Sequence, residues 1–183
     1  MRSVLPFDEI NRLTADIRER FKKKEHIDTE DIIDEMFELF LLTYANANRV
    51  TGESLSFEYE PPVDEVLETV NEVVAGKTWK ERTEEYLEND GSAEDLVKIV
   101  ETETHRIANE AALSTAGKAG ATKKRWVTML DDRVRDTHAP LEGITVPYDA
   151  DFYTFDGDHA RAPGLFALPE NNINCRCELI FEK

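Results

Sequence analysis

The spacing of hydrophobic residues changes once along this 183-residue chain, near residue 120, and the change restricts the folds available to it. In the earlier part, apolar side chains such as Leu96, Val100 and Ile107 recur at intervals that place them on one face of a helix. In the last part, residues 175–181 alternate between apolar and polar side chains, which is typical of a strand with one buried face. This order predicts an α+β fold, in which a helical N-terminal region precedes a small antiparallel sheet packed on a long helix.

Five helices are expected before the change in spacing. Their approximate limits are residues 7–24, 29–47, 62–76, 78–89 and 92–116. Pro62 suits a first helical turn, and Ser92 is a suitable N-cap residue. Thr78 and Glu81 have the spacing of a capping box. Residues 51–61 are expected to form a linker or a short extended segment.

Three short strands are expected after the change in spacing. They lie within residues 126–130, 141–148 and 175–181. Cys175, Cys177 and Leu179 share one face of the last strand, and we expect that face to be buried. Residues 149–174 are rich in Pro, Gly, Asn and Asp, which predicts a long loop that is irregular but ordered.

The negative charge is concentrated in the helical part of the chain. The formal net charge is −17, and the segment from Glu25 to Asp95 holds 21 acidic and four basic residues. Such a surface repels phosphate, which argues against wholesale wrapping of nucleic acid and against adhesion to an anionic membrane. A hydrophobic content of 40% excludes a disordered chain. We therefore expect residues 1–75 to form an acidic helical N-terminal region.

The sequence contains no feature of a secreted or membrane-spanning protein. No apolar run is long enough to cross a bilayer, and the first residues, MRSVLPFDEI, lack the apolar centre of a signal peptide. The two cysteines are only two residues apart, a spacing that rarely permits an unstrained disulfide. These features predict synthesis in a reducing cytosol.

Glu103, Arg106 and Asn109 are spaced by three residues and form a polar ridge on the long helix. One interpretation is an exposed ridge that carries an ordinary Glu–Arg pair. The other is that the ridge faces the C-terminal sheet, where the carboxylate and the guanidinium hold loop backbone by hydrogen bonds. His105 is expected beside the ridge and exposed to solvent.

A dense run of charges, DDRVRDTH, occupies residues 131–138. If the segment turns helically, Arg135 can pair with Asp131 or Asp132 and anchor the neighbouring loop. A catalytic alternative is an acid–base cluster in which His138 is the general base and Asp132 stands beside it. The anchoring interpretation is favoured, because no G-x-S-x-G or comparable nucleophile element accompanies the cluster.

His138, His159, Cys175 and Cys177 are the nitrogen and sulfur ligands that a zinc site would use. The spacing is unusual for zinc, because Cys-x-Cys is shorter than the common Cys-x₂₋₄-Cys knuckle. The alternative, which the sequence favours, is that the cysteines are small apolar residues on the inner face of the last strand.

The chain has no convincing phosphate-binding loop. GKTW at residues 76–79 lacks the upstream glycine of a Walker motif and indicates a helix end followed by an N-cap. The main basic cluster outside the first helix is Lys118, Lys123, Lys124 and Arg125, which is expected to be ordinary surface.

A series of motifs follows in the second half of the chain: TETHRIANEA (102–111), KRWVTMLDDRVRDTH (124–138), LEGITV (141–146), APG (162–164) and NCRCEL (174–179). In this order they resemble the MuF-like family, the minor head or head morphogenesis proteins of tailed phages and prophages. The resemblance covers about residues 76–183. The matching residues are Glu103, Arg106, Asn109, Trp126, Asp132, Arg135, His138, Gly143, Pro163, Gly164, Asn174, Cys175, Arg176 and Cys177.

The resemblance implies a structural role in head assembly near the portal, with assistance in DNA packaging or delivery, and no catalytic activity or cofactor. It implies the portal and other head proteins as partners, with packaged DNA as a secondary contact. It also implies a place inside the virion head after assembly in the host cytoplasm. A buried polar network would fix the loops of the sheet, formed by Glu103, Arg106, Asn109, Asp132, Arg135, His138, Asn174 and Arg176.

Two departures from the family pattern are visible. The N-terminal region is shorter and more acidic than in many members. Some members have an additional His just before Asn-Cys-Arg-Cys, where this chain has ALPENNIN, and this difference argues against a metal site.

Two other functions stay open from the sequence. One is a metal-dependent nuclease or hydrolase that uses His138 with Asp132. The other is an acidic DNA mimic, which would require the carboxylates of residues 25–95 to line one face.

Overall fold

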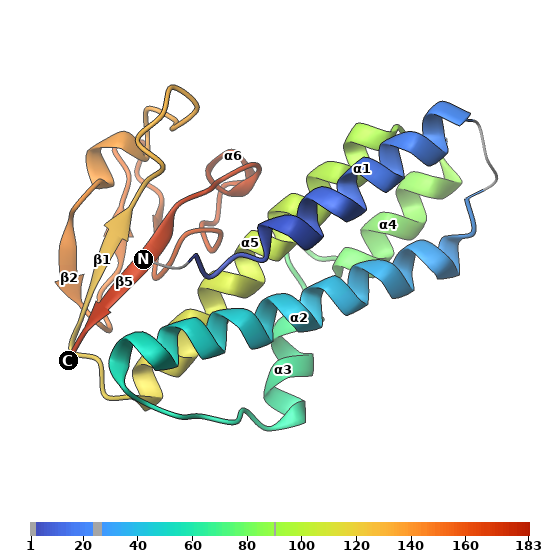
Figure 1. Ribbon diagram of the computed structural model, residues 1–183. Helices are drawn as coiled ribbons and strands as arrows, with labels where there is room; N and C mark the ends of the chain where they lie inside the picture. The colour runs from blue at the N-terminus through green and yellow to red at the C-terminus, as the bar shows by residue number, and fades with distance from the viewer. Residues whose placement is uncertain (1–2, 24–26, 90) are drawn as a thin grey trace.

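The long helix α5 (Ala93–Lys118) is the element around which the others are arranged in the computed structural model (Figure 1), which describes residues 3–23, 27–89 and 91–183. Lys24, at the expected end of the first helix, lies outside the described residues. Helix α5 contacts α1 (Phe7–Lys23), α2 (Thr29–Leu55), α3 (Val63–Val70), α4 (Trp79–Glu88) and β5 (Glu178–Glu182). The expected α+β fold is confirmed.

The predicted helix starts are present, and their capping groups explain them. The side chain of Thr78 accepts a hydrogen bond from the Glu81 amide, and Glu81 reaches back to the Thr78 amide. Ser92 and Asp95 form the same reciprocal box at the start of α5. Each box satisfies backbone amides that the first turn of a helix leaves without partners.

Two helix ends differ from the sequence prediction. Helix α2 continues through residues 51–55, which were expected to be a linker, because Val50, Thr51 and Leu55 extend its buried face. Helix α3 ends at Val70 rather than near residue 76. The backbone after it turns through left-handed residues at positions 75 and 76, and a single bridge pairs positions 74 and 77.

The sheet has three antiparallel strands in the order β2–β1–β5, formed by Thr145–Pro147, Lys123–Val127 and Glu178–Glu182. Trp126 is the register partner of Leu179, so the two side chains lie on the same face. The first strand begins and ends three residues earlier than predicted, and Leu130, expected inside it, has a left-handed φ of 54°. The alternation predicted for the end of the chain is confirmed, with both cysteines, Leu179 and Phe181 buried.

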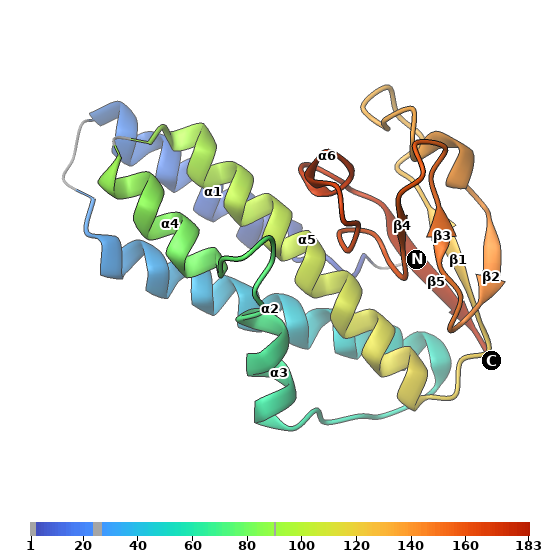
Figure 2. The same cartoon turned by 180° about the vertical axis from the view of Figure 1, so that it is seen from behind.

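The expected irregular loop contains three small elements: a hairpin of β3 (Phe152–Tyr153) and β4 (His159–Ala160), and the short helix α6 (Pro169–Asn172). A 3₁₀ turn at Ala139–Leu141 precedes β2. Figure 2 shows the hairpin beside the sheet, and the ring of Phe152 meets that of Trp126 edge-on with centroids 5.1 Å apart. The loop is therefore part of the core.

Gly164 brings this loop directly onto α5. Its φ is +85°, and a Cβ atom built there would lie 3.1 Å from the Cα of Arg106. Both the backbone angle and the close approach require glycine. The position belongs to the APG motif, so the structure gives this motif a packing role.

We expect Gly164→Ala to destabilise the protein more than Gly157→Ala. Gly157 has a similar φ of +89°, but a Cβ atom added to it would meet no other atom within 4 Å, so its variant carries only the backbone strain of about 1–2 kcal/mol. Gly164→Ala adds a steric clash of about 1–3 kcal/mol. Urea denaturation of both variants measures the difference, and equal losses would show that the contact with α5 is unimportant.

Candidate functional site

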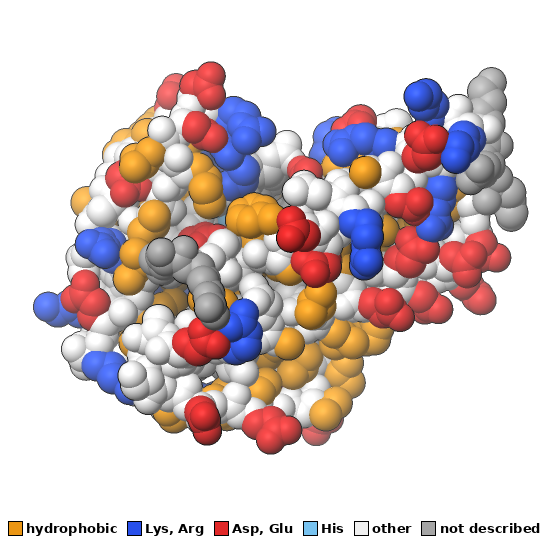
Figure 3. Space-filling model, in the orientation of Figure 1, with side chains coloured by type: hydrophobic (Ala, Val, Ile, Leu, Met, Phe, Trp, Pro, Cys, Tyr) orange, Lys and Arg blue, Asp and Glu red, His pale blue; other side chains and the backbone are white. Residues whose placement is uncertain are grey.

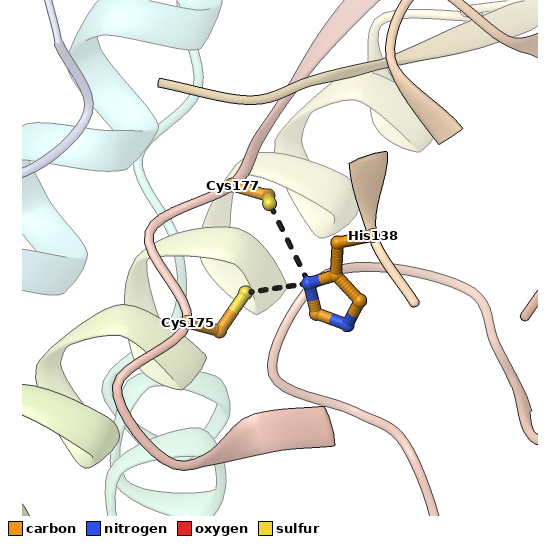
Figure 4. A group of neighbouring side chains, drawn as sticks. All are labelled: His138, Cys175 and Cys177. Atoms are coloured by element: carbon orange, nitrogen blue, oxygen red, sulfur yellow. Dashed lines mark hydrogen bonds between the residues drawn. The ribbon is translucent and has the colours of Figure 1, made fainter. Parts of the chain in front are cut away.

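Three of the four candidate metal ligands lie close together, next to the start of β5. The Nδ1 atom of His138 lies 3.6 Å from the Sγ of Cys175 and 3.6 Å from the Sγ of Cys177 (Figure 4). All three side chains are buried, and their ligand atoms lie within 4.8 Å of one another. The Cys-x-Cys spacing works because both sulfurs point to the same side of the extended backbone before β5.

Aromatic rings fix the orientation of the His138 ring. Phe166 stacks on it with a centroid distance of 5.3 Å, and Trp126 meets it edge-on at 5.4 Å. The other ring nitrogen, Nε2, is buried without a hydrogen-bond partner among the described residues. Ring packing on one side and the contacts with the two sulfurs on the other therefore hold Nδ1 in place.

The two thiols have different pKa values because each acts on the other. A hydrogen bond from Cys177, supported by His138, lowers the pKa of Cys175. The hydrogen bond with Cys175, together with burial, raises the pKa of Cys177. The pKa of Cys175 is therefore the lower of the two.

The segment that carries the cysteines is held from both sides. The Asn109 amide on α5 donates to the carbonyl oxygen of Cys177 at 3.3 Å. Arg176, between the cysteines, makes two hydrogen bonds of 2.6 and 2.8 Å to the carboxylate of Asp131 and lowers the pKa of that carboxyl to about 2. Asn174 precedes them with a left-handed φ of 57°, which turns the chain into this segment.

The polar ridge on α5 is buried, and most of it serves the helices rather than the sheet. Arg106 is 2% exposed and bonds Glu103 and Glu72 at 2.9 Å each, and it also bonds Glu110. Its remaining amino group donates to the carbonyl of Thr69 at the end of α3. One guanidinium thus ties α5 to the end of α3 and to the segment that follows it.

Two acidic groups complete this cluster. Glu103 also pairs with Arg82 of α4, so it has two cationic partners. Burial raises the pKa of Glu110 to about 8, because desolvation outweighs the attraction of Arg106. Of the three ridge residues, only Asn109 holds backbone next to the C-terminal sheet, at Cys177. The Arg106 guanidinium donates instead to Thr69 within α3, and the Glu103 carboxylate pairs with Arg82 and Arg106.

The predicted network of eight residues is divided among separate clusters. Arg135 donates to the carbonyls of Asn171 and Ile173 and so anchors the end of α6. Asp132 is exposed and makes no hydrogen bond or ion pair within the described chain, and its neighbour Asp131 is the partner of Arg176 instead. The pairs expected between Arg135 and the adjacent aspartates are not formed, since Arg135 points toward α6.

Two histidines lie elsewhere than expected. His159 is largely exposed and pairs with Asp151 at 2.8 Å, so it is not part of the cysteine cluster. His105 was expected to be exposed but is 3% exposed, because its side of α5 faces the segment that carries the cysteines, which Asn109 contacts one turn later. Its ring lies 3.4 Å from the amide nitrogen of Asn109.

The residues that order the long loop form no motif that the sequence reveals. The carboxylate of Asp158 accepts from the amides of His159, Ala167 and Leu168. The side chain of Asn171 joins it and also reaches Asp156, both at 3.1 Å. The only available signal was the local richness in Asp and Asn, which indicates turns but not which turn residues meet.

Lys124 corrects the expectation of a basic surface cluster. Its side chain lies on the inner face of the sheet, fully buried, and its amine has no hydrogen-bond partner among the described residues. The amine lies 5.6 Å from the Phe152 ring centroid and 5.8 Å from that of Tyr148. Burial lowers its pKa to about 8, and the charge of Arg161 adds to this effect.

We expect Arg106→Met to destabilise the protein by about 3–5 kcal/mol, because it breaks a buried ion-pair network, leaves Glu103 with Arg82 as its remaining cationic partner and removes the hydrogen bond to Thr69. Arg49→Met is the control, since Arg49 forms an exposed pair with Glu53 and its loss costs roughly 0.5 kcal/mol or less. Urea unfolding at pH 7 compares them. Similar losses in the two variants would contradict the role given to the buried cluster.

We expect Lys124→Met to stabilise the protein at pH 7 by about 1–3 kcal/mol. The folded pKa of about 8 lies below the unfolded value of 10.5, so the cost of burying the ammonium is complete below pH 8. Between these pKa values the unfolded chain binds more protons, and wild-type stability rises with pH. The variant should lose this rise, and the exposed Lys123→Met should keep it, as thermal unfolding from pH 7 to 10 would reveal.

Comparisons with known proteins agree with the motif order. The model of the family described as Phage Mu protein F like protein matches residues 64–180, from α3 into β5. No solved structure matches the chain. Among the described residues, no helix is long and apolar enough to cross a membrane.

Two curated relatives are similar to parts of the chain. NAD(+)--arginine ADP-ribosyltransferase EFV of Enterococcus faecalis is 28% identical over 151 residues, which cover 77% of this chain and 31% of that protein. Minor head protein GP7 of Bacillus phage SPP1 is 32% identical over 83 residues, 44% of this chain and 27% of that protein. Each match thus spans less than a third of the relative. Because the family model covers more than half of the chain, the expected resemblance is confirmed, and the chain belongs to the Phage Mu protein F like family.

Proposed function

We propose that this chain is a structural component of a phage head, which acts in head assembly near the portal and assists DNA packaging or delivery. The observation that carries the proposal is the family match over residues 64–180. The similarity to a protein named as a minor head protein supports the same role. We also propose that the boundary near residue 75 separates an acidic helical region from the family domain, residues 76–183.

The surface of α2 supports docking on a basic protein. Acidic side chains gather along its N-terminal half, where Glu30, Asp31, Asp34 and Glu38 are exposed (Figure 3). A row of carboxylates attracts a basic surface and speeds its association, but it repels the phosphates of packaged DNA. The partner proposed for this face is therefore the portal or another head protein, with DNA as a secondary contact.

We propose that the chain has no catalytic activity. The candidate polar residues make contacts inside the fold: Arg106 with carboxylates, and Arg135 with carbonyls near α6. The transferase activity in the name of one relative belongs to that protein, of which less than a third is matched here. Incubation with labelled NAD⁺ and an arginine-bearing acceptor should give no transfer.

A metal-dependent nuclease or hydrolase that uses His138 with Asp132 is the alternative. The geometry supports it less, because Asp132 is exposed whereas the Nδ1 of His138 faces the two cysteines. Cleavage of DNA or RNA that disappears in Asp132→Asn would favour this alternative over the structural role.

We expect this protein to bind the portal protein of the same phage, and we expect the binding to weaken with salt. Changing the four exposed acidic residues in the N-terminal half of α2 to Lys should abolish co-purification with the portal and incorporation into heads. Because opposite charges attract at short range and salt screens them, the loss should exceed tenfold at about 0.1 M salt.

The control is a variant with the same change in charge on another part of the surface. It replaces the exposed residues Asp132, Asp136, Glu170 and Glu182 by Lys. Equal loss of binding in both variants would mean that net charge, not α2, determines association. Normal incorporation of the α2 variant would refute the proposed docking face.

A further inference from the structure

The distances around His138 match those of a tetrahedral zinc site. Zinc bonds sulfur at about 2.3 Å and imidazole nitrogen at about 2.0–2.1 Å, so at the tetrahedral angle nitrogen and sulfur lie about 3.6 Å apart. The two measured separations between His138 Nδ1 and the cysteine sulfurs are both 3.6 Å. A pair of ordinary thiol–imidazole hydrogen bonds would not require both sulfurs to be equidistant from one nitrogen.

We propose that His138, Cys175 and Cys177 bind one zinc ion, with a water molecule as the fourth ligand. Two thiolates and a neutral imidazole are a soft donor set that suits zinc and does not suit magnesium or calcium. On binding, the ion replaces the remaining thiol protons, which pass to solvent. Zinc with two thiolates has no net charge, so the nearby guanidiniums of Arg135 and Arg176 do not oppose it.

The fourth position has a place in the structure. A small pocket, lined by Met129 and by residues 133–135, 138 and 174–177, opens at the three ligands and has a volume of about 10 Å³. That is close to the space needed for a single water molecule. The pocket thus provides both an entry path and room for one small ligand, while the aromatic rings close the other side of His138.

The ion would act as a clamp between two segments that are distant in sequence. His138 lies just before the 3₁₀ turn, and the cysteines lie just before β5. Cys175 is 37 positions and Cys177 39 positions after His138 in the sequence. Arg176, between the cysteines, already bonds Asp131 in the same loop, so the two contacts act together. By linking these segments the ion would stabilise the loop, and this effect is independent of the head-assembly role proposed above.

Elemental analysis and cobalt substitution test the proposal on the whole chain. Protein purified with reductant and supplied with Zn²⁺ should retain about one zinc per chain after dialysis. The Co²⁺ form should show thiolate-to-cobalt charge-transfer absorption and the visible bands of a tetrahedral site. Removal of zinc by a chelator should lower the melting temperature by about 5–10 °C.

Matched variants identify the ligands. Cys175→Ser, Cys177→Ser and His138→Asn should each lose the cobalt spectrum, whereas His159→Asn should keep it, because His159 is exposed and lies outside the cluster. If a cysteine variant fails to fold, the Co²⁺ titration of the wild-type chain decides. Wild-type protein that binds neither Zn²⁺ nor Co²⁺, or a spectrum unchanged in all three ligand variants, would overturn the proposal.

Discussion

The burial of α5 on nearly every side is the constraint on which the remaining structure depends. A helix in this position must place its polar side chains inside the protein, where each needs a partner. Arg106 meets this need with Glu72, Glu103, Glu110 and the end of α3. Asn109 meets it at the cysteine segment. Helices and sheet are thus joined through polar contacts as well as through the apolar core.

Local chemistry made much of the fold predictable. The capping boxes at Thr78 and Ser92 and the alternation before β5 depend on residues a few positions apart, so the sequence itself contains the signal. Helix ends were less predictable, because tertiary contacts decide them: α2 gains two turns from burial at its C-terminal end. The exposure expected for His105 was wrong for the same reason, since its burial depends on a distant segment that packs on that side of α5.

The candidate site was predictable in its residues but not in its grouping. The sequence motifs contain His138, both cysteines and the arginines. Which residues these side chains contact, however, depends on the path of a loop of more than twenty residues. That path follows from Asp158, Asn171 and Gly164, whose side-chain or backbone requirements become visible only when distant segments meet. The adjacent residues Asp131 and Asp132 illustrate this: the sequence does not distinguish them, but only Asp131 lies within reach of Arg176 in the fold.

The pairing of β1 with β5 has a consequence for how the protein folds during synthesis. Strand β1 emerges directly after α5, but the strand that covers one of its edges is made about fifty residues later. The helices can associate early, whereas the sheet must wait for a contact between distant segments, which is entropically slow. Until then, one edge of β1 has unpaired backbone groups, so the newly made chain passes through a stage that is prone to aggregation.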